Sequence, residues 1–428
     1  MKYSEYKSCR RDYQERGHLF LLEMKHACLF YKPGKGKTYP CIDALLDVAK
    51  EKPDCNVLIL STANAIKNMW IAEIVPQNIL PKNTVLMSFN SAIVESTKIQ
   101  LLKIKWDVII IDECHKIKSH NTKSSKLVYQ LSKKAKYVWG LSGTPRGNSD
   151  IDIFCQFHNM CISDWGTISY SHFVNTCCDV DKKFFGGNVV NVPIGINKRY
   201  KGGWERNIAM YTQRVDYCDD DNMPNLDVTV VNVPYKATKE YLQAEDGVVS
   251  VGDYETTMTK LAAIQKCHQA ANGYLYIPDD EGGRTTYRIN RNGKLNWLKD
   301  NLTNEPTVIV YRFEADAEDL MCELSDLGYS YTEIVDDFKA GGIDVLLLQC
   351  AKCESFNLQM CNKIIFYTLD YSYINYDQML HRVWRMGQEK DVSIIVLVND
   401  GTIEESIWKS VKNKESFANT FMNIKGGI

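Results

Sequence analysis

Residues 34–38, Gly-Lys-Gly-Lys-Thr, carry the pattern of a phosphate-binding turn. The apolar run 27–31 before them suits a buried strand, and apolar residues recur at helical spacing after them, through Val48. The glycines are therefore expected where a strand turns into a helix, so that backbone N–H groups can bind phosphate. Lys37 would contact the β- and γ-phosphates of ATP, and the Thr38 hydroxyl would hold Mg²⁺. The expected nucleotide-binding residues of this turn are Gly34, Lys35, Gly36, Lys37 and Thr38.

The pentapeptide alone has a second interpretation. The full P-loop pattern has a glycine five residues before Gly36, and Tyr31 stands at that place. A surface turn rich in glycine and lysine would look the same. The sequence further along the chain favours the phosphate-binding interpretation.

An acidic pair follows a second apolar run, residues 106–111, which is interrupted only by Asp107. Such a run is typical of a central parallel strand that is covered on both faces. Asp112 and Glu113 would then lie at its carboxyl end, where open α/β sheets bind ligands. Asp112 is expected to hold Mg²⁺ through water, and Glu113 to orient the attacking water as general base. A solvated acidic pair at a strand end is the alternative, which the phosphate-binding turn makes less favoured.

Length and composition limit the class of protein. A chain of 428 residues is too long for one ordinary domain, and its 45% hydrophobic and 24% charged residues are typical of a globular protein. The sequence has no run of eighteen apolar residues and no apolar signal segment at its start, so we expect a cytoplasmic protein without a membrane span. Fifteen scattered cysteines indicate buried, reduced thiols. Cys350, Cys353 and Cys361 lack a second pair or a histidine at zinc-finger spacing, so no metal site is expected there.

Charge is distributed unevenly along a chain whose net charge is −2. Lysines crowd the segment 98–136 around the acidic motif. A second basic stretch comprises Lys198, Arg199, Lys201, Arg206 and Arg214. A basic face could bind a phosphate backbone, or it could be a solvated surface, and charge alone leaves both open.

Strands and helices alternate in both halves of the chain. The expected strands are 27–31, 57–60, 84–88, 108–111 and 137–141 in the first half, and 306–311, 343–348, 363–367 and 392–398 in the second. The pattern predicts an α/β fold with two parallel sheets. We expect a first lobe over 1–222, with an elaboration at 163–222, a hinge near 219–225, and a second lobe over 223–428. Between Leu327 and Ile343 there is little room for the usual strand and helix.

The motifs together resemble the Swi/Snf-type group of superfamily-two helicase-like ATPases. Residues 112–118, Asp-Glu-Cys-His-Lys-Ile-Lys, are similar to the family's DEAH-like box, and residues 68–73 to its motif Ia. By this resemblance Gln14, beside Tyr13, would read adenine. His115 would link the hydrolytic site to the other lobe. Ser142 and Thr144, in the motif III-like segment 141–145, would couple nucleotide state to lobe movement.

The second half carries the more specific match. Residues 378–388 and 401–405 resemble the group's motif VI and the segment that follows it. Arg382 and Arg385 are expected one helical turn apart on the same face, where they could act as arginine fingers. Gln378 and Asn357 would belong to the coupling machinery. The motif V-like segment 351–359 keeps Asn357 but has no glycine, so it is expected to be stiffer than in relatives.

The resemblance implies two RecA-like lobes in tandem that bind ATP and Mg²⁺ and hydrolyse ATP. It implies a DNA-dependent ATPase that translocates on or remodels double-stranded DNA, as a monomer with unknown protein partners, from a bacterial or phage source. A strand-separating or branch-migrating helicase is one alternative. An ATP-dependent clamp or scaffold without motor activity is another, from a different class.

Overall fold

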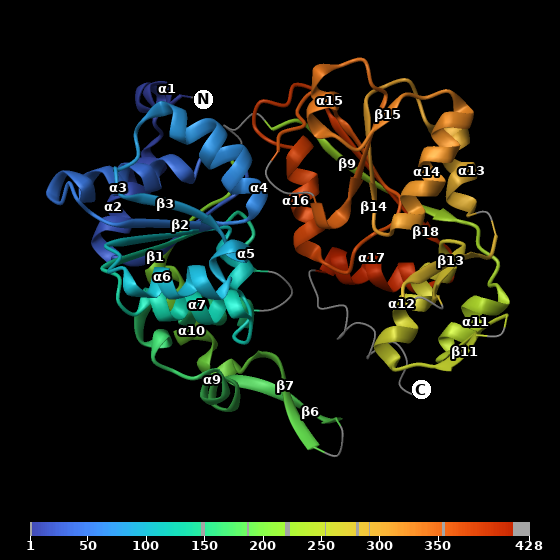
Figure 1. Ribbon diagram of the computed structural model, residues 1–428, viewed down its shortest axis with the longest axis horizontal. Helices are drawn as coiled ribbons and strands as arrows, with labels where there is room; N and C mark the ends of the chain where they lie inside the picture. Colours follow the sequence, from blue (N-terminus) through green and yellow to red (C-terminus); the bar gives the residue numbers. More distant parts are fainter. Residues whose placement is uncertain are drawn as a thin grey trace. The chain divides into compact units, whose positions relative to one another are not determined.

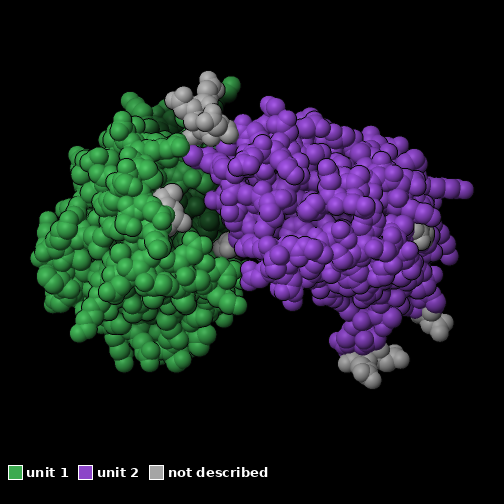
Figure 2. Space-filling model, turned by 90° about the horizontal axis from the view of Figure 1, so that it is seen from above, with its two compact units in different colours: residues 1–221 green, residues 222–428 purple. Residues whose placement is uncertain are grey.

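The computed structural model describes residues 2–146, 150–185, 188–218, 223–252, 254–279, 282–290, 292–352 and 356–413. The chain divides into two compact units, Met1–Asp221 and Asn222–Ile428, which Figure 2 shows in different colours. Residues 219–222 of the expected hinge lie outside the described part. None of the described helices has the length and apolar character needed to cross a membrane.

The first unit is built on a six-stranded sheet in which every neighbouring pair is parallel. Its order is β3-β2-β4-β5-β1-β8. The strands are β1 (His26–Tyr31), β2 (Val57–Ser61), β3 (Thr84–Ser88), β4 (Val108–Asp112), β5 (Tyr137–Leu141) and β8 (Thr212–Val215). The five strands expected in this half are confirmed. The parallel sheet brings the carboxyl ends of β4, β5 and β1, which are neighbours, to one edge.

Helices cover both faces of this sheet, as Figure 1 shows. Side chains that alternate along β4 enter different cores: Ile109 and Ile111 lie in one buried cluster, Val108 and Ile110 in the other. Burial on both faces explains why the sequence of β4 is a nearly continuous run of apolar residues. The helical segments of the unit are α1 (Tyr3–Cys9), α2 (Asp12–Met24), α3 (Thr38–Glu51), α4 (Ala63–Ala65), η1 (Ile66–Ile74), η2 (Val75–Gln77), α5 (Phe89–Ala92), α6 (Glu95–Lys103), η3 (Cys114–Ile117), α7 (Lys123–Ser132), α8 (Ile151–Asn159), η4 (Ser163–Gly166), α9 (Tyr170–Cys177) and α10 (Lys198–Tyr211).

The segment 163–222 is not purely an elaboration, and that expectation is wrong in part. After α9 the chain forms an antiparallel hairpin, β6 (Cys178–Phe185) and β7 (Asn188–Ile196), and then α10. It returns as β8, which pairs with β1 and completes the sheet. Polar residues interrupt β8, Thr-Gln-Arg-Val, because it is an edge strand. This composition hides it from an apolar pattern.

The second unit contains a second six-stranded sheet, of order β15-β16-β14-β17-β18-β9, with parallel neighbours throughout. Its strands are β9 (Leu226–Val233), β14 (Thr307–Tyr311), β15 (Tyr331–Thr332), β16 (Val345–Gln349), β17 (Lys363–Phe366) and β18 (Val392–Asn399). The four expected strands are confirmed. Little room for a strand and a helix was expected between Leu327 and Ile343. Both are present there but short: β15 has two residues and the helix has six.

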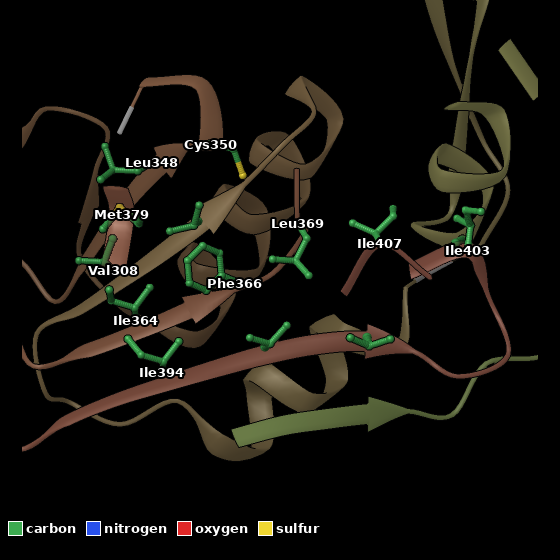
Figure 3. Packing of buried hydrophobic residues seen from close by; sticks show 14 of the residues in the cluster. Val308, Leu348, Cys350, Ile364, Phe366, Leu369, Met379, Ile394, Ile403 and Ile407 are labelled. Carbon is green, nitrogen blue, oxygen red and sulfur yellow. The ribbon is translucent and has the colours of Figure 1, made fainter. Parts of the chain in front are cut away.

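In the sequence, an insertion of helices and hairpins lies between β9 and the other strands of the second sheet. It consists of α11 (Lys239–Glu245), β10 (Val248–Val251), β11 (Tyr254–Thr257), α12 (Lys260–Ala271), β12 (Tyr274–Pro278) and β13 (Arg284–Arg288). The remaining helical segments are α13 (Gly293–Asn301), α14 (Glu314–Leu327), α15 (Val335–Ala340), η6 (Cys350–Lys352), α16 (Tyr373–Val383) and α17 (Ile403–Asn413). Figure 3 shows one core of this unit, where Val308, Ile364 and Ile394 on neighbouring strands pack with Met379 of α16 and Ile407 of α17.

A buried ion pair joins the helices of the second unit. The Lys294 ammonium donates to Glu404 at 2.7 Å, and neither side chain is more than 3% exposed. Lys294 also donates to the carbonyl of Tyr367 at 2.8 Å, and the Asn399 N–H donates to Glu404 at 2.8 Å. Burial alone would raise the pKa of Glu404, but the Lys294 charge, the contact with His268 and these hydrogen bonds outweigh it and lower the pKa to about 2.

This ion pair predicts acid sensitivity of the second unit. Because the folded pKa of Glu404 lies below its ordinary value of 4.5, its contribution to stability is complete above that value and is lost as pH falls towards about 2. We expect Glu404→Gln to lower the free energy of unfolding by roughly 3 kcal/mol at pH 7, and the difference from wild type to shrink below pH 4.5. Denaturant unfolding between pH 2 and 7 measures it. The exposed neighbour Glu405→Gln is the control, and an equal effect of both changes would contradict the prediction.

Candidate functional site

The phosphate-binding turn lies between β1 and α3, as expected. Thr38 is the first residue of α3, so the unpaired N–H groups of that helix face the turn. Gly34 and Gly36 have φ angles of +87° and +70°, a region that side-chain-bearing residues rarely adopt. The turn is therefore a backbone cradle whose shape depends on both glycines, and the absence of a glycine at Tyr31 does not prevent it.

Helix α2 holds this cradle from behind. The Gln14 amide donates to the carbonyl of Lys35 at 3.2 Å and to that of Gly36 at 3.4 Å. The Tyr13 hydroxyl donates to the same Lys35 carbonyl at 3.1 Å. A Cβ atom on Gly36 would lie 2.7 Å from the Gln14 nitrogen, so the Gln14 side chain or the turn would have to move to accept one. Gln14 thus fixes the shape of the turn in addition to the adenine contact expected for it.

Lys35 is buried, unlike a lysine on the protein surface. Its side chain is 1% exposed, and its ammonium lies 5.5 Å from the ring centre of Tyr13 and 5.9 Å from that of Tyr217. The Tyr217 hydroxyl donates to the carbonyl of Pro33 at 2.7 Å. Aromatic rings stabilise the buried cation through their negative faces. Lys35 therefore supports the turn from inside, and its backbone remains the part suited to phosphate.

A network around Asp43 fixes helix α3, which begins at this turn. The Asp43 carboxylate accepts hydrogen bonds from Tyr3, Tyr6, Lys7 and Arg10, at 2.9 Å from Tyr6 and 2.7 Å from Lys7. Burial would raise the pKa of Asp43, but these donors lower it. The first helix of the chain is thereby tied to the helix whose N-terminus faces the phosphate site.

Asp112 ends β4 and is buried, 3% exposed. Its Oδ2 accepts from the Ser61 hydroxyl at 3.0 Å and the Trp70 indole at 3.1 Å, and its Oδ1 accepts from the Glu113 N–H at 3.1 Å. Trp70 lies in η1, a π-helix, a rare geometry that is frequent at functional sites. Burial and the neighbouring Glu113 charge raise the pKa of Asp112. The Ser61 contact was not expected from the sequence.

Glu113 is held in the left-handed region, with φ +55° and ψ +50°. One carboxylate oxygen lies 3.9 Å from the Lys37 ammonium and the other 3.2 Å from the His115 ring. A left-handed conformation in a residue with a side chain costs about 1–2 kcal/mol and is concentrated at functional sites. The backbone here turns Glu113 towards Lys37, so the two expected catalytic groups of this unit are brought together.

The end of β5 lies beside these groups. The Ser142 hydroxyl is 3.2 Å from the His115 Nδ1 and accepts from the Thr144 N–H at 3.1 Å. A Cβ on Gly143, between them, would lie 3.1 Å from the Pro33 ring. A continuous chain of contacts thus runs from Lys37 through Glu113 and His115 to Ser142. The structure brings together the five catalytic and coupling residues that the sequence assigns to this half: Lys37, Glu113, His115, Ser142 and Thr144.

The residues at this edge fit a magnesium ion. Mg²⁺ prefers hard oxygen ligands, often one or two carboxylates or hydroxyls together with water and phosphate oxygens. Asp112 is a buried carboxylate that three donors orient, and burial together with the Glu113 charge raises its pKa. The Thr38 hydroxyl, at the first residue of α3, lies 3.8 Å from the Met69 sulfur, a weak acceptor that an ion can replace.

The two arginines of the second unit do not share a helical face, and that expectation is wrong. Helix α16 ends at Val383, so Arg382 is in its last turn and Arg385 is in the turn beyond. Trp384 stops the helix because its backbone is extended and its indole donates to the Pro224 carbonyl at 2.9 Å. Both arginines are half-buried. Arg382 contacts the Phe356 carbonyl at 3.4 Å.

Hydrogen bonds hold the motif V-like segment against the end of α16 and the turn that follows it. The Leu358 N–H donates to the Arg382 carbonyl at 3.0 Å, and the buried Gln388 amide donates to the carbonyls of Gln359 and Cys361 at 3.0 and 2.8 Å. Asn357 is exposed and bonds to Gln359, whereas Gln378 is buried in α16. These contacts show how a segment without glycine is kept in one conformation. Residues 353–355, including Cys353, lie outside the described part.

Known proteins were compared with the chain. A family model described as SNF2-related domain matches residues 75–178. An uncharacterized ATP-dependent helicase, YqhH, of Bacillus subtilis (strain 168) is 25% identical over 403 residues, which are 84% of this chain and 69% of that protein. A SWI/SNF-related matrix-associated actin-dependent regulator of chromatin subfamily A-like protein 1 of Drosophila melanogaster is 22% identical over 446 residues, 94% of this chain and 54% of its own length. The chain thus spans little more than half of the second relative.

A solved structure is also similar. The Sulfolobus solfataricus SWI2/SNF2 ATPase core in complex with dsDNA has a TM-score of 0.42 and 21% identity, and the match covers 97% of this chain and 94% of that one.

The packing of Gln14 against the turn predicts that Gly36→Ala weakens ATP binding. The added Cβ meets the Gln14 nitrogen at 2.7 Å, and the backbone is left-handed there. We expect affinity for ATP to fall by about tenfold or more, since the left-handed strain alone is of that order. Titration with a fluorescent ATP analogue measures it. Gly202→Ala, in open space on α10, is the control; if the two variants bind ATP equally well, the cradle does not depend on Gly36.

Proposed function

We propose that the chain is an ATP-hydrolysing enzyme of the Swi/Snf-type group of helicase superfamily two, and that it couples hydrolysis to translocation on, or remodelling of, double-stranded DNA. One observation carries the enzymatic part. The phosphate-binding turn, the buried Asp112, and Glu113 beside Lys37 converge at one edge of the first sheet. A protein that only switches on ATP binding does not require a base held in a strained conformation beside the phosphate lysine.

The proposed roles follow from the chemistry of each group. Residues 34–38 bind the triphosphate through backbone N–H groups, and Lys37 neutralises charge on its outer phosphates. Thr38 and Asp112 would hold Mg²⁺, which when bound supplies further positive charge to the phosphates. Glu113 orients the attacking water and accepts its proton, because its carboxylate lies 3.9 Å from the Lys37 ammonium and is 19% exposed, whereas Asp112 is buried and held by three hydrogen bonds.

His115 and Ser142 are suited to reporting the state of Glu113. A change in the charge or position of Glu113 alters its contact with His115, and Ser142 passes that change to the end of β5. Thr144 follows, because its N–H bonds to the Ser142 hydroxyl. We propose that this path couples hydrolysis to movement of the chain segments that grip DNA.

Arg382 and Arg385 are proposed to stabilise charge that develops in the transition state, as arginine fingers from the second unit. Their support is the resemblance of residues 378–388 to the family motif and the fixed position of that turn against residues 357–361. Asn357 and Gln378 are proposed to act in coupling.

Double-stranded DNA is the proposed partner, and its support is the similarity to an ATP-dependent helicase and to a regulator of chromatin, together with exposed lysines. Lys116, Lys123 and Lys126 follow the acidic motif and are exposed, in an arrangement suited to a phosphate backbone. The bacterial relatives support a setting in the cytoplasm of a bacterial cell. We propose that the chain acts as a monomer, since each unit has its own sheet and core.

The proposal predicts an ATPase that duplex DNA stimulates. Steady-state phosphate release should rise about tenfold or more with linear duplex, and much less with single-stranded DNA or RNA, because lobe closure on the bound partner completes the catalytic site. Lys37→Ala and Glu113→Gln should abolish both basal and stimulated turnover, and Glu113→Gln should still bind ATP. The exposed Glu95→Gln serves as the matched control.

Two results would argue against it. Normal hydrolysis by Lys37→Ala would remove the assignment of the phosphate site. Wild-type turnover that no nucleic acid changes would favour an ATP-dependent clamp or scaffold over a motor.

A further inference from the structure

Helix α8 turns two buried amide side chains towards the acidic motif. Gln156 is 0% exposed and Asn159 is 2% exposed, a position in which an amide without partners would be costly. The helix packs against η3, which begins directly after Glu113. Helix α8 is therefore a direct neighbour of the segment that carries the proposed general base.

Gln156 uses both ends of its amide. Its oxygen accepts a hydrogen bond from the Cys114 thiol at 3.2 Å, and its nitrogen donates to the Pro145 carbonyl at 2.7 Å. The nitrogen also donates to a carbonyl of its own helix, four residues earlier, at 3.0 Å. Cys114 stands between Glu113 and His115, and Pro145 ends the motif III-like segment. One buried side chain therefore bridges the segment of the general base and the segment proposed for coupling.

Neighbouring contacts make this bridge rigid. The Asn159 amide donates to the Ile117 carbonyl at 2.8 Å, so α8 holds η3 at its last residue as well as at its first. Cys114 is 0% exposed and belongs to the same core cluster as Phe157 of α8. Burial raises the pKa of the Cys114 thiol, so the thiol keeps the proton that it donates to Gln156. The bridge is thus a neutral contact that does not titrate near neutral pH.

The conformation of Glu113 needs such a support. Its backbone is left-handed, with φ +55°, a strained conformation that persists only where the surrounding structure holds it. Cys114, the next residue, is fixed by Gln156, and the His115 ring lies 3.2 Å from the Ser142 hydroxyl. Two contacts at different points set the angle between the acidic motif and the motif III-like segment, whereas one contact would leave them free to pivot.

We propose that Gln156 is a positioning residue for ATP hydrolysis. Through Cys114 it holds Glu113 in its left-handed conformation, and through Pro145 it links that conformation to the motif III-like segment. The inference rests on the proposed function, because it names a further residue that the proposed general base requires. The bridge acts on the chemical step rather than on ATP binding, since both of its partners lie outside the phosphate-binding turn.

Gln156→Leu tests this, because leucine fills the space with apolar atoms and makes neither bond. We expect kcat for ATP hydrolysis to fall about tenfold, with and without duplex DNA, because a base displaced by about 1 Å can lose that much or more. KM and the affinity for a fluorescent ATP analogue should stay within about twofold of the wild-type values. Gln130→Leu, exposed on α7, is the matched control, and circular dichroism shows that both variants are folded.

The residue that donates to Gln156 supplies a rescue. Cys114→Ala removes the thiol donor and should lower kcat several-fold without raising KM. Cys114→Ser, which restores a donor, should recover most of that loss. The double variant Cys114→Ala, Gln156→Leu should be no slower than Gln156→Leu alone, because both changes break the same bridge.

Three results would overturn the inference. An unchanged kcat of Gln156→Leu would show that hydrolysis does not depend on the bridge. A rise of KM as large as the fall of kcat would show a general structural role, and equal losses in Cys114→Ser and Cys114→Ala would show that the hydrogen bond is not what matters. A wild type that duplex DNA does not stimulate contradicts the proposed function, yet its basal turnover still decides this test. A wild type without any hydrolysis would overturn both.

Discussion

The parallel pairing of β4, β5 and β1 is the constraint on which the candidate site depends. Neighbouring parallel strands end at the same edge, so three segments far apart in the sequence must meet there. Asp112 is buried at that edge and takes three hydrogen bonds, which hold it against the repulsion of Glu113. The strained backbone of Glu113 then points its carboxylate towards Lys37. If the pairing of the strands shifted by one residue, these side chains would turn to the other face of the sheet and would no longer meet.

Supports around this edge explain why it can be rigid and still respond. Gln14 and Tyr13 fix the phosphate-binding turn from α2, while the Asp43 network fixes α3. On the other side, His115 contacts both Glu113 and Ser142, so a change at Glu113 can alter these contacts. The second unit is stabilised by its own hydrophobic core and by the buried ion pair of Lys294 and Glu404. Its arginine-bearing turn is fastened to the segment 357–361 rather than to a continuous helix.

Apolar patterns predicted the sheets well because most of their strands are buried on both faces. They missed the edge strands β8, β9 and the two-residue β15, and β8 and β9 have exposed polar positions such as Arg214 and Asp227. Motif spacing placed Lys37, Glu113, His115 and Ser142 near one another, but it could not show that Lys35 is buried or that Ser61 binds Asp112. Helical periodicity failed at Arg385, because the end of α16 is set by a tertiary contact of Trp384 with Pro224. Such contacts depend on residues far apart in the chain, which local patterns do not include.

The central proposal is that groups from both units act on one magnesium-bound triphosphate. A structure of the chain with ADP, Mg²⁺ and aluminium fluoride, which imitates the phosphoryl group in the transition state, tests it most directly. The account predicts the fluoride between Lys37 and Glu113, Mg²⁺ on Thr38 with Asp112 bound to it through water, and the Arg382 guanidinium within hydrogen-bond distance of the fluoride. A nucleotide held by residues 34–38 with both Arg382 and Arg385 remote from it would contradict the account.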